Sequence, residues 1–168
     1  MNKILLVDDD PYILSALQRT LRHFMQGEEL QIETFTNPLE ALNRICECEF
    51  DLIISDYMMP QLNGAELLEA LKEVAPDTVR IMLSASSDFD TMLSTINQAQ
   101  AFRFMLKPWD RQALEQNVRL ALQLRATLLV ARDGVVELTA EQREGARLEA
   151  EEPGILTVRR DSDGAILM

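Results

Sequence analysis

The sequence has few cysteines and only short apolar runs, and these absences exclude several classes of protein. Its two cysteines, Cys46 and Cys48, lie two positions apart, which does not suit the disulfide framework of a secreted domain. They also supply only two of the about four ligands of a structural zinc site, so we interpret them as reduced thiols. No apolar run approaches the roughly 20 residues of a membrane helix. The N-terminus has one lysine and a short apolar run before three acids, unlike a secretory signal, and we expect a cytoplasmic protein.

Basic residues are scarce as well. The sequence has 16 Lys and Arg against 28 Asp and Glu, a formal net charge of −12. Such a chain repels phosphate backbones, so we expect no direct binding to nucleic acid or to anionic membranes. No glycine-rich phosphate loop of the nucleotide-binding kind is present. The single histidine, His23, has no candidate nucleophile near it in the pattern, and we expect no catalytic role for it.

Two kinds of apolar pattern alternate along residues 1–125. Continuous apolar runs, such as Ile4 to Val7, are typical of strands buried on both faces. Between these runs, apolar residues recur at helical spacing, as in Pro11 to Met25. Five strands that each precede a helix predict an α/β fold, an open parallel sheet with helices on both faces. The predicted strands are 4–7, 30–35, 52–54, 79–83 and 102–106, and the predicted helices are 11–25, 38–47, 65–74, 88–99 and one that begins at 110.

Polar side chains stand where four of these strands end. Asp8 and Asp9 follow the first strand, Asp56 the third, Ser84 the fourth and Lys107 the fifth. The carboxyl ends of parallel strands share one edge of the sheet, where the sites of such folds lie. Three carboxylates held close together favour a hard divalent cation. A lysine neutralises phosphate charge and a serine hydroxyl donates to a phosphoryl oxygen. The set fits phosphoryl transfer to a carboxylate nucleophile.

Four segments carry a resemblance to a known family. They are LLVDDD at 5–10, DLIISDYMMPQLNG at 51–64, LSA at 83–85 and FRFMLKPW at 102–109. In this order and spacing they resemble the receiver domain of two-component response regulators. The resemblance covers about residues 1–125 and implies a flavodoxin-like, doubly wound five-stranded parallel sheet of order 2-1-3-4-5. It also implies a phosphorylation-activated switch whose phosphoryl donor is a sensor histidine kinase or a phosphotransfer protein.

The resemblance assigns a metal site and a phosphoacceptor. Asp56 would accept the phosphoryl group. Mg²⁺, or Mn²⁺, would be held by Asp9 directly, by Asp8 through a water molecule, by Asp56 and by the backbone carbonyl of Met58.

The same resemblance assigns three further residues around the phosphoryl group. Lys107 would bind the phosphoryl group and Ser84 would turn toward it. Phe104 occupies the family's switch position, where an aromatic side chain moves inward when the hydroxyl moves. Since aromatic residues in strands usually pack in the core, Phe104 is equally well interpreted as a core residue.

Residues 126–168 do not fit the receiver pattern. We predict that the last receiver helix runs on to about residue 129 and that Asp133-Gly134 stops it. A short strand at 135–138, an acidic helix at 139–151 and a hairpin at 155–168 would follow. This small α+β appendage is too short for a familiar output domain, and we interpret it as a docking or dimerisation element.

Two alternatives to a phosphorylation switch remain open from the sequence. A phosphatase of the haloacid-dehalogenase type uses similar residues, but its nucleophilic Asp lies on the first strand, whereas Asp56 follows the third. A receiver that is never phosphorylated would serve as a scaffold. The output partner would be either a second copy of the chain or a separate protein.

Overall fold

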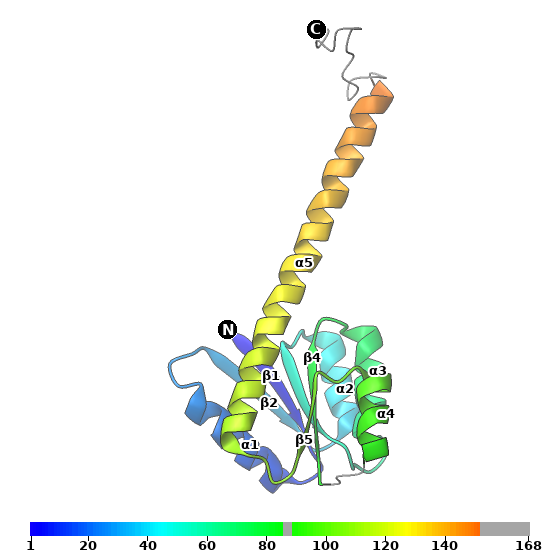
Figure 1. The fold of residues 1–168 in the computed structure, drawn as a ribbon. Coiled ribbons are helices and arrows are strands. Elements are labelled where there is room, and N and C mark those ends of the chain that lie inside the picture. Colours follow the sequence, from blue (N-terminus) through cyan, green and yellow to red (C-terminus); the bar gives the residue numbers. More distant parts are fainter. Residues whose placement is uncertain (86–88, 152–168) are drawn as a thin grey trace. The chain divides into compact units, whose positions relative to one another are not determined.

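The computed structural model describes residues 1–85 and 89–151, in which strands and helices alternate (Figure 1). The strands are β1 (Asn2–Val7), β2 (Leu30–Phe35), β3 (Leu52–Asp56), β4 (Val79–Ser84) and β5 (Arg103–Leu106). The helices are α1 (Pro11–Phe24), α2 (Pro38–Glu47), α3 (Gly64–Val74), α4 (Phe89–Ala99) and α5 (Arg111–Glu151). The alternation predicted for the first 110 residues is therefore confirmed.

The five strands form one parallel sheet in the order β2-β1-β3-β4-β5. β1 pairs with β2 on one side and with β3 on the other, so that Val7 lies opposite both Phe35 and Ser55. This order confirms the predicted flavodoxin-like topology. It places β1 and β3, which carry the predicted carboxylates at their ends, side by side.

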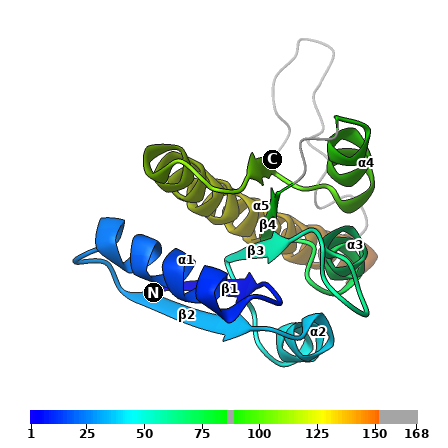
Figure 2. The same cartoon turned by 90° about the horizontal axis from the view of Figure 1, so that it is seen from below.

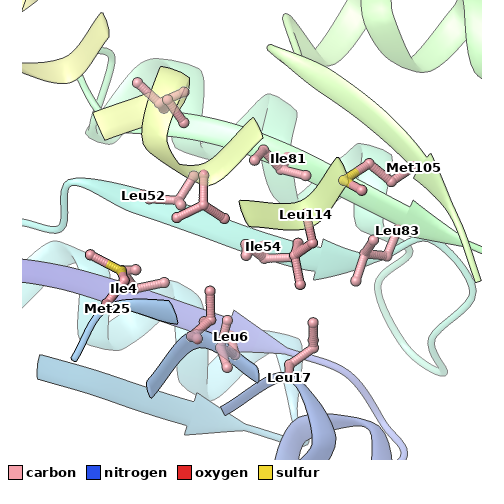
Figure 3. Close-up of a cluster of buried hydrophobic side chains, with 14 of the residues drawn as sticks. Ile4, Leu6, Leu17, Met25, Leu52, Ile54, Ile81, Leu83, Met105 and Leu114 are labelled. Carbon is pink, nitrogen blue, oxygen red and sulfur yellow. The ribbon is translucent and has the colours of Figure 1, made fainter. Parts of the chain in front are cut away.

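Helices cover both faces of the sheet (Figure 2). On one face, α1 and the first part of α5 bury leucines such as Leu17 and Leu114 against Ile4, Leu6 and Ile54 (Figure 3). On the other face lie α2, α3 and α4, and the leucines of α3 pack on the sheet. Each fully buried leucine contributes about 1.5–3 kcal/mol to folding. The two cores hold the strands in register and thereby fix the positions of the strand ends.

Helices α1, α2 and α3 begin at polar N-cap residues. The Asp10 side chain accepts a hydrogen bond from the backbone N–H of Tyr12, and Asn37 caps α2 in the same way. A third cap, in which Asn63 and Glu66 bond each other's backbone N–H groups, begins α3. Such caps fix the entry of each helix at the edge where the strands end.

The stop predicted at Asp133-Gly134 and the strand predicted at 135–138 were wrong, whereas residues 139–151 are helical as predicted, as the last part of α5. α5 continues without a break from Arg111 to Glu151, so Asp133-Gly134 does not end it, and 135–138 is helical instead of a strand. A glycine inside a helix costs about 1 kcal/mol, and the alanine, leucine, glutamate and arginine residues around it are strong helix formers. The predicted hairpin at 155–168 lies outside the described residues.

The chain divides into two units, residues 1–128 and 129–168. The first unit contains the whole sheet, both hydrophobic cores and the first part of α5. Within the described residues, no helix has both the length and the apolar composition that crossing a membrane requires.

Candidate functional site

The carboxyl edge of the sheet brings the predicted site residues together. Asp8 follows β1, Asp56 ends β3, Ser84 ends β4, and Lys107 follows β5. The backbone pairing also continues past the last strand, because the N–H of Lys107 donates to the carbonyl of Ser84 at 2.8 Å. This hydrogen bond holds the backbone of Lys107 next to the end of β4.

Lys107 is the centre of the cluster. Its ammonium lies 2.6 Å from Oδ2 of Asp8 and 2.9 Å from Oδ1 of Asp56. Both aspartates are buried, with 1% and 6% of their surface exposed. The other oxygen of Asp8, Oδ1, accepts a hydrogen bond of 2.9 Å from the backbone N–H of Asp10. Buried charges at this edge are thus paired and hydrogen-bonded, as their desolvation requires.

The proximity of these groups shifts two pKa values. Burial raises the pKa of Asp8 above its ordinary value, and the charge of Asp56 adds to the increase, while Lys107 and the Asp10 N–H oppose it. Burial alone would lower the pKa of Lys107, but its hydrogen bonds to Asp8 and Asp56 outweigh burial and raise it. Lys107 therefore stays protonated, and the carboxylates next to it face more negative than positive charge.

A third carboxylate, Asp9, completes a donor set for a cation. One oxygen from each of Asp8, Asp9 and Asp56 lies within 4.8 Å of the others. Asp8 and Asp56 are buried, and Asp9 is exposed to solvent. Oxygen ligands of this kind, with room for water on one side, fit Mg²⁺ or Mn²⁺. In the described part of the chain, this trio is the only such cluster of three acidic, histidine or cysteine side chains.

The loop after β3 is shaped by close packing at Gly64. A Cβ atom at this position would overlap the backbone carbonyl oxygen of Asp56 and touch the sulfur of Met82. The N–H of Gly64 also donates to the carbonyl of Tyr57 at 2.8 Å. The direct contact with the backbone of the predicted phosphoacceptor was missed, because it depends on how α3 approaches β3.

The predicted switch residues lie on adjacent strands. Ser84 is fully buried at the end of β4, and the neighbouring Met82 lies opposite Phe104 of β5. Phe104 is partly buried and packs against the core on the α2–α3 face, together with Tyr57. The side chain of Met58, whose backbone carbonyl is the predicted metal ligand, is 67% exposed beside the site.

The cysteines lie away from this cluster. Cys46 and Cys48 are free thiols, as predicted. The Cys48 sulfur accepts a hydrogen bond of 3.5 Å from the ammonium of Lys3, near the opposite edge of the sheet. Neither thiol contributes to the candidate site.

Comparison with known proteins decides the family. A family model described as the response regulator receiver domain matches residues 4–119. The chain belongs to this family. Its members are the phosphorylation-activated regulators of two-component systems, so the receiver identification made from the sequence motifs is confirmed.

Two relatives show how far the similarity extends. The hydrogenase transcriptional regulatory protein HoxA of Cupriavidus necator is 32% identical over 120 residues, which cover 71% of this chain and 24% of HoxA. The C4-dicarboxylate transport transcriptional regulatory protein DctD of Pseudomonas aeruginosa is 29% identical over 157 residues, covering 94% of this chain and 33% of DctD. The chain thus spans between a quarter and a third of the length of these relatives.

Solved structures share the fold. The signal receiver domain of an HD domain-containing protein from Pseudomonas fluorescens has a TM-score of 0.69 and 32% identity, covering 75% of this chain and 98% of that one. A structure described as adenylate cyclase from Rhodopirellula baltica has a TM-score of 0.70 and 27% identity, covering 82% of this chain and 98% of that one.

Membership of the receiver family removes the dehalogenase-type phosphatase from the alternatives.

Proposed function

We propose that Asp56 is the phosphoacceptor of this receiver and that a phosphohistidine of a sensor histidine kinase or phosphotransfer protein is the donor. The observation that carries the proposal is the buried pair of Asp56 and Lys107, 2.9 Å apart at the carboxyl edge of the sheet. The carboxylate of Asp56 can act as the nucleophile, and the ammonium beside it offsets part of the negative charge of the acyl phosphate that would form.

The transfer exchanges one bond for another at phosphorus. A carboxylate oxygen of Asp56 attacks the phosphorus atom, an acyl phosphate bond forms, and the P–N bond to the donor imidazole breaks. The imidazole nitrogen takes up a proton as it leaves. Lys107, which binds Asp56 in the absence of phosphate, is within reach of a phosphoryl oxygen on the same carboxylate. Its positive charge then offsets the charge that the phosphoryl group brings.

The carboxylates of Asp8, Asp9 and Asp56, with the backbone carbonyl of Met58, would hold Mg²⁺ or Mn²⁺. When bound, the ion neutralises negative charge on the phosphoryl oxygens. Asp8 is fixed for this role by two hydrogen bonds, one from Lys107 and one from the Asp10 N–H. The exposed Asp9 completes the set from the solvent side.

Phosphorylation would act on the rest of the receiver through Ser84 and Phe104. The Ser84 hydroxyl would donate to a phosphoryl oxygen, and Phe104 would move further into the α2–α3 core as the serine turns. Phe104 has no hydroxyl, so its movement changes packing alone. Such a change biases an equilibrium between two conformations.

The output would be a protein–protein contact, either between two copies or with a separate protein. The elements after Ser84 carry large apolar side chains on their surface. Leu93 and Ile96 of α4, Leu106 of β5 and Leu120 of α5 are between 38% and 47% exposed. Apolar side chains on a surface that responds to phosphorylation suit a regulated interface. The net charge of −12 supports an output that does not involve direct contact with nucleic acid.

The test is intact mass after incubation with Mg²⁺ and acetyl phosphate or phosphoramidate, with size measured on the same sample. We expect the gain of one phosphoryl group, lost in Asp56→Ala and retained in the control variant Asp133→Ala, at an exposed position of α5. A change in size would assign the output to a second copy, and constant size would assign it to a separate protein. The absence of any mass gain at saturating Mg²⁺ would overturn the proposal in favour of the unphosphorylated scaffold.

A further inference from the structure

Two adjoining cavities lie between α1 and the start of α5, away from the phosphorylation site. The smaller, about 400 Å³, is lined by Ala16, Arg19, Thr20, His23 and Arg111. The larger, about 700 Å³, is lined by His23, Phe24, Trp109, Asp110, Arg111, Gln112 and Glu115. Because His23 and Arg111 line both cavities, the two lie next to each other, and we call them together the α1–α5 groove.

The basic side chains of the groove lack partners. Within the residues that the structure describes, the side chains of Arg19, His23 and Arg111 make no hydrogen bond or ion pair. Arg119, further along α5, behaves differently: it binds Glu28, Glu115 and the carbonyl of Phe24. In a chain with 28 acids and 16 bases, two unpaired guanidinium groups and an imidazole around one small cavity indicate a site for an anion.

The larger cavity adds two aromatic rings. Phe24 and Trp109 are partly buried and pack against the core beneath α1 and α5. The Phe24 ring already has the guanidinium of Arg119 at 6.0 Å from its centroid. Trp109 is therefore the ring in the groove that a planar ligand can stack on, and stacking of a base on an aromatic side chain contributes about 1–3 kcal/mol.

We propose that the α1–α5 groove binds a nucleotide, with its phosphates on Arg19, His23 and Arg111 and its base on Trp109. The basic groups surround a cavity of about 400 Å³, which suits one compact, multiply charged group better than carboxylates spread along a peptide. The adjoining aromatic cavity has the size of a ligand site. The proposal goes beyond phosphorylation of Asp56 and does not depend on it.

The experiment is isothermal titration calorimetry of the full chain with ATP and GTP in the presence of a chelator, so that the carboxylate cluster holds no cation. Adenosine and tripolyphosphate, each carrying half of the proposed chemistry, are titrated in parallel. Trp109 is the single tryptophan of the chain, so its fluorescence reports directly on the groove. We expect saturable binding of a nucleotide with a change in Trp109 fluorescence, and at least roughly tenfold weaker binding of each half-ligand.

Variants assign the binding to the groove. Arg111→Gln and Arg19→Gln are expected to weaken nucleotide binding at least roughly tenfold, and Trp109→Leu, measured by calorimetry, to do the same. Arg22→Gln is the matched control, because Arg22 neighbours His23 on α1 but lines neither cavity. The proposal is overturned if no nucleotide binds saturably, if tripolyphosphate binds as tightly as ATP, or if an oligoglutamate peptide binds more tightly than either nucleotide.

Discussion

The ammonium of Lys107 lies between two buried carboxylates, 2.6 Å from Asp8 and 2.9 Å from Asp56. The three side chains come from the ends of β5, β1 and β3, so one lysine connects strands that are far apart in the sequence. The same contact offsets part of the negative charge at this carboxylate-lined edge and places a positive charge where a phosphoryl group on Asp56 would need it.

Removing the Lys107 charge will destabilise the cation-free protein. In Lys107→Ala, two carboxylates remain buried without their partner, and we expect the free energy of unfolding to fall by on the order of 3 kcal/mol in a chelator. Urea unfolding measures this loss. Saturating Mg²⁺ is expected to restore part of it. The control Lys72→Ala, at the end of α3, should stay within about 0.5 kcal/mol of the parent chain. Equal losses in the two variants would contradict the prediction.

Mg²⁺ will stabilise the folded chain through the three carboxylates. At a concentration of about 100 times the dissociation constant, a ligand that binds only the folded state adds about 2.7 kcal/mol. Thermal unfolding with and without Mg²⁺ checks this. Asp9→Asn is expected to abolish the Mg²⁺-dependent shift. Asp10→Asn is expected to keep it, because asparagine caps α1 as well as aspartate does. A shift that survives in Asp9→Asn would remove Asp9 from the cation site.

Replacing Gly64 or Gly134 by alanine will change the stability of the protein in opposite directions. Gly64→Ala forces a methyl group against the Asp56 carbonyl, so we expect a loss of about 1–3 kcal/mol and slower phosphorylation. At Gly134, inside α5, a Cβ meets no atom within 4 Å, and alanine should add about 1 kcal/mol to helix stability. Urea unfolding and circular dichroism measure both. Less helix in Gly134→Ala than in the parent chain would argue against a continuous α5.

The ion pair between Glu33 of β2 and Arg44 of α2 will contribute to stability in a pH-dependent way. Arg44 binds Glu33 with two hydrogen bonds, of 2.8 and 3.0 Å, which hold the pKa of Glu33 below its ordinary value of 4.5. The folded state therefore favours the ionised acid. Its stabilising contribution is complete above the unfolded-state pKa and is lost as pH falls through the lower, folded-state pKa. Unfolding free energies of the parent chain and Glu33→Gln should differ at neutral pH and converge in acid.

The parallel sheet and the strand-end site were predictable because both depend on local patterns. Runs such as Leu52-Ile53-Ile54 indicated buried strands, and parallel strands direct Asp56 and Lys107 to one edge whatever the details of packing. The roles of these residues came from the family resemblance. The 2.6 Å contact between Lys107 and Asp8 was not predictable, because side-chain distances depend on the path of the chain after β5.

Other features were missed for reasons of tertiary structure or competing local preference. Gly134 signalled a helix end, but the helix formers on both sides outweigh its cost and α5 runs through it. Arg125 was not singled out, yet it is only 4% exposed and its guanidinium binds Asp51 at 3.3 Å, before the start of β3. Burial of an arginine depends on a partner distant in sequence, which a pattern along the chain does not reveal.

The most direct test of the central claim is to locate the phosphoryl group at a single residue. The chain is phosphorylated with acetyl phosphate and Mg²⁺ and then treated with borohydride, which reduces an acyl phosphate of aspartate to homoserine. Peptide mass spectrometry then reads the position. The account predicts homoserine at Asp56 and unchanged aspartate at Asp8 and Asp9. Homoserine at Asp8 or Asp9 in the parent chain, with Asp56 unmodified, would contradict it.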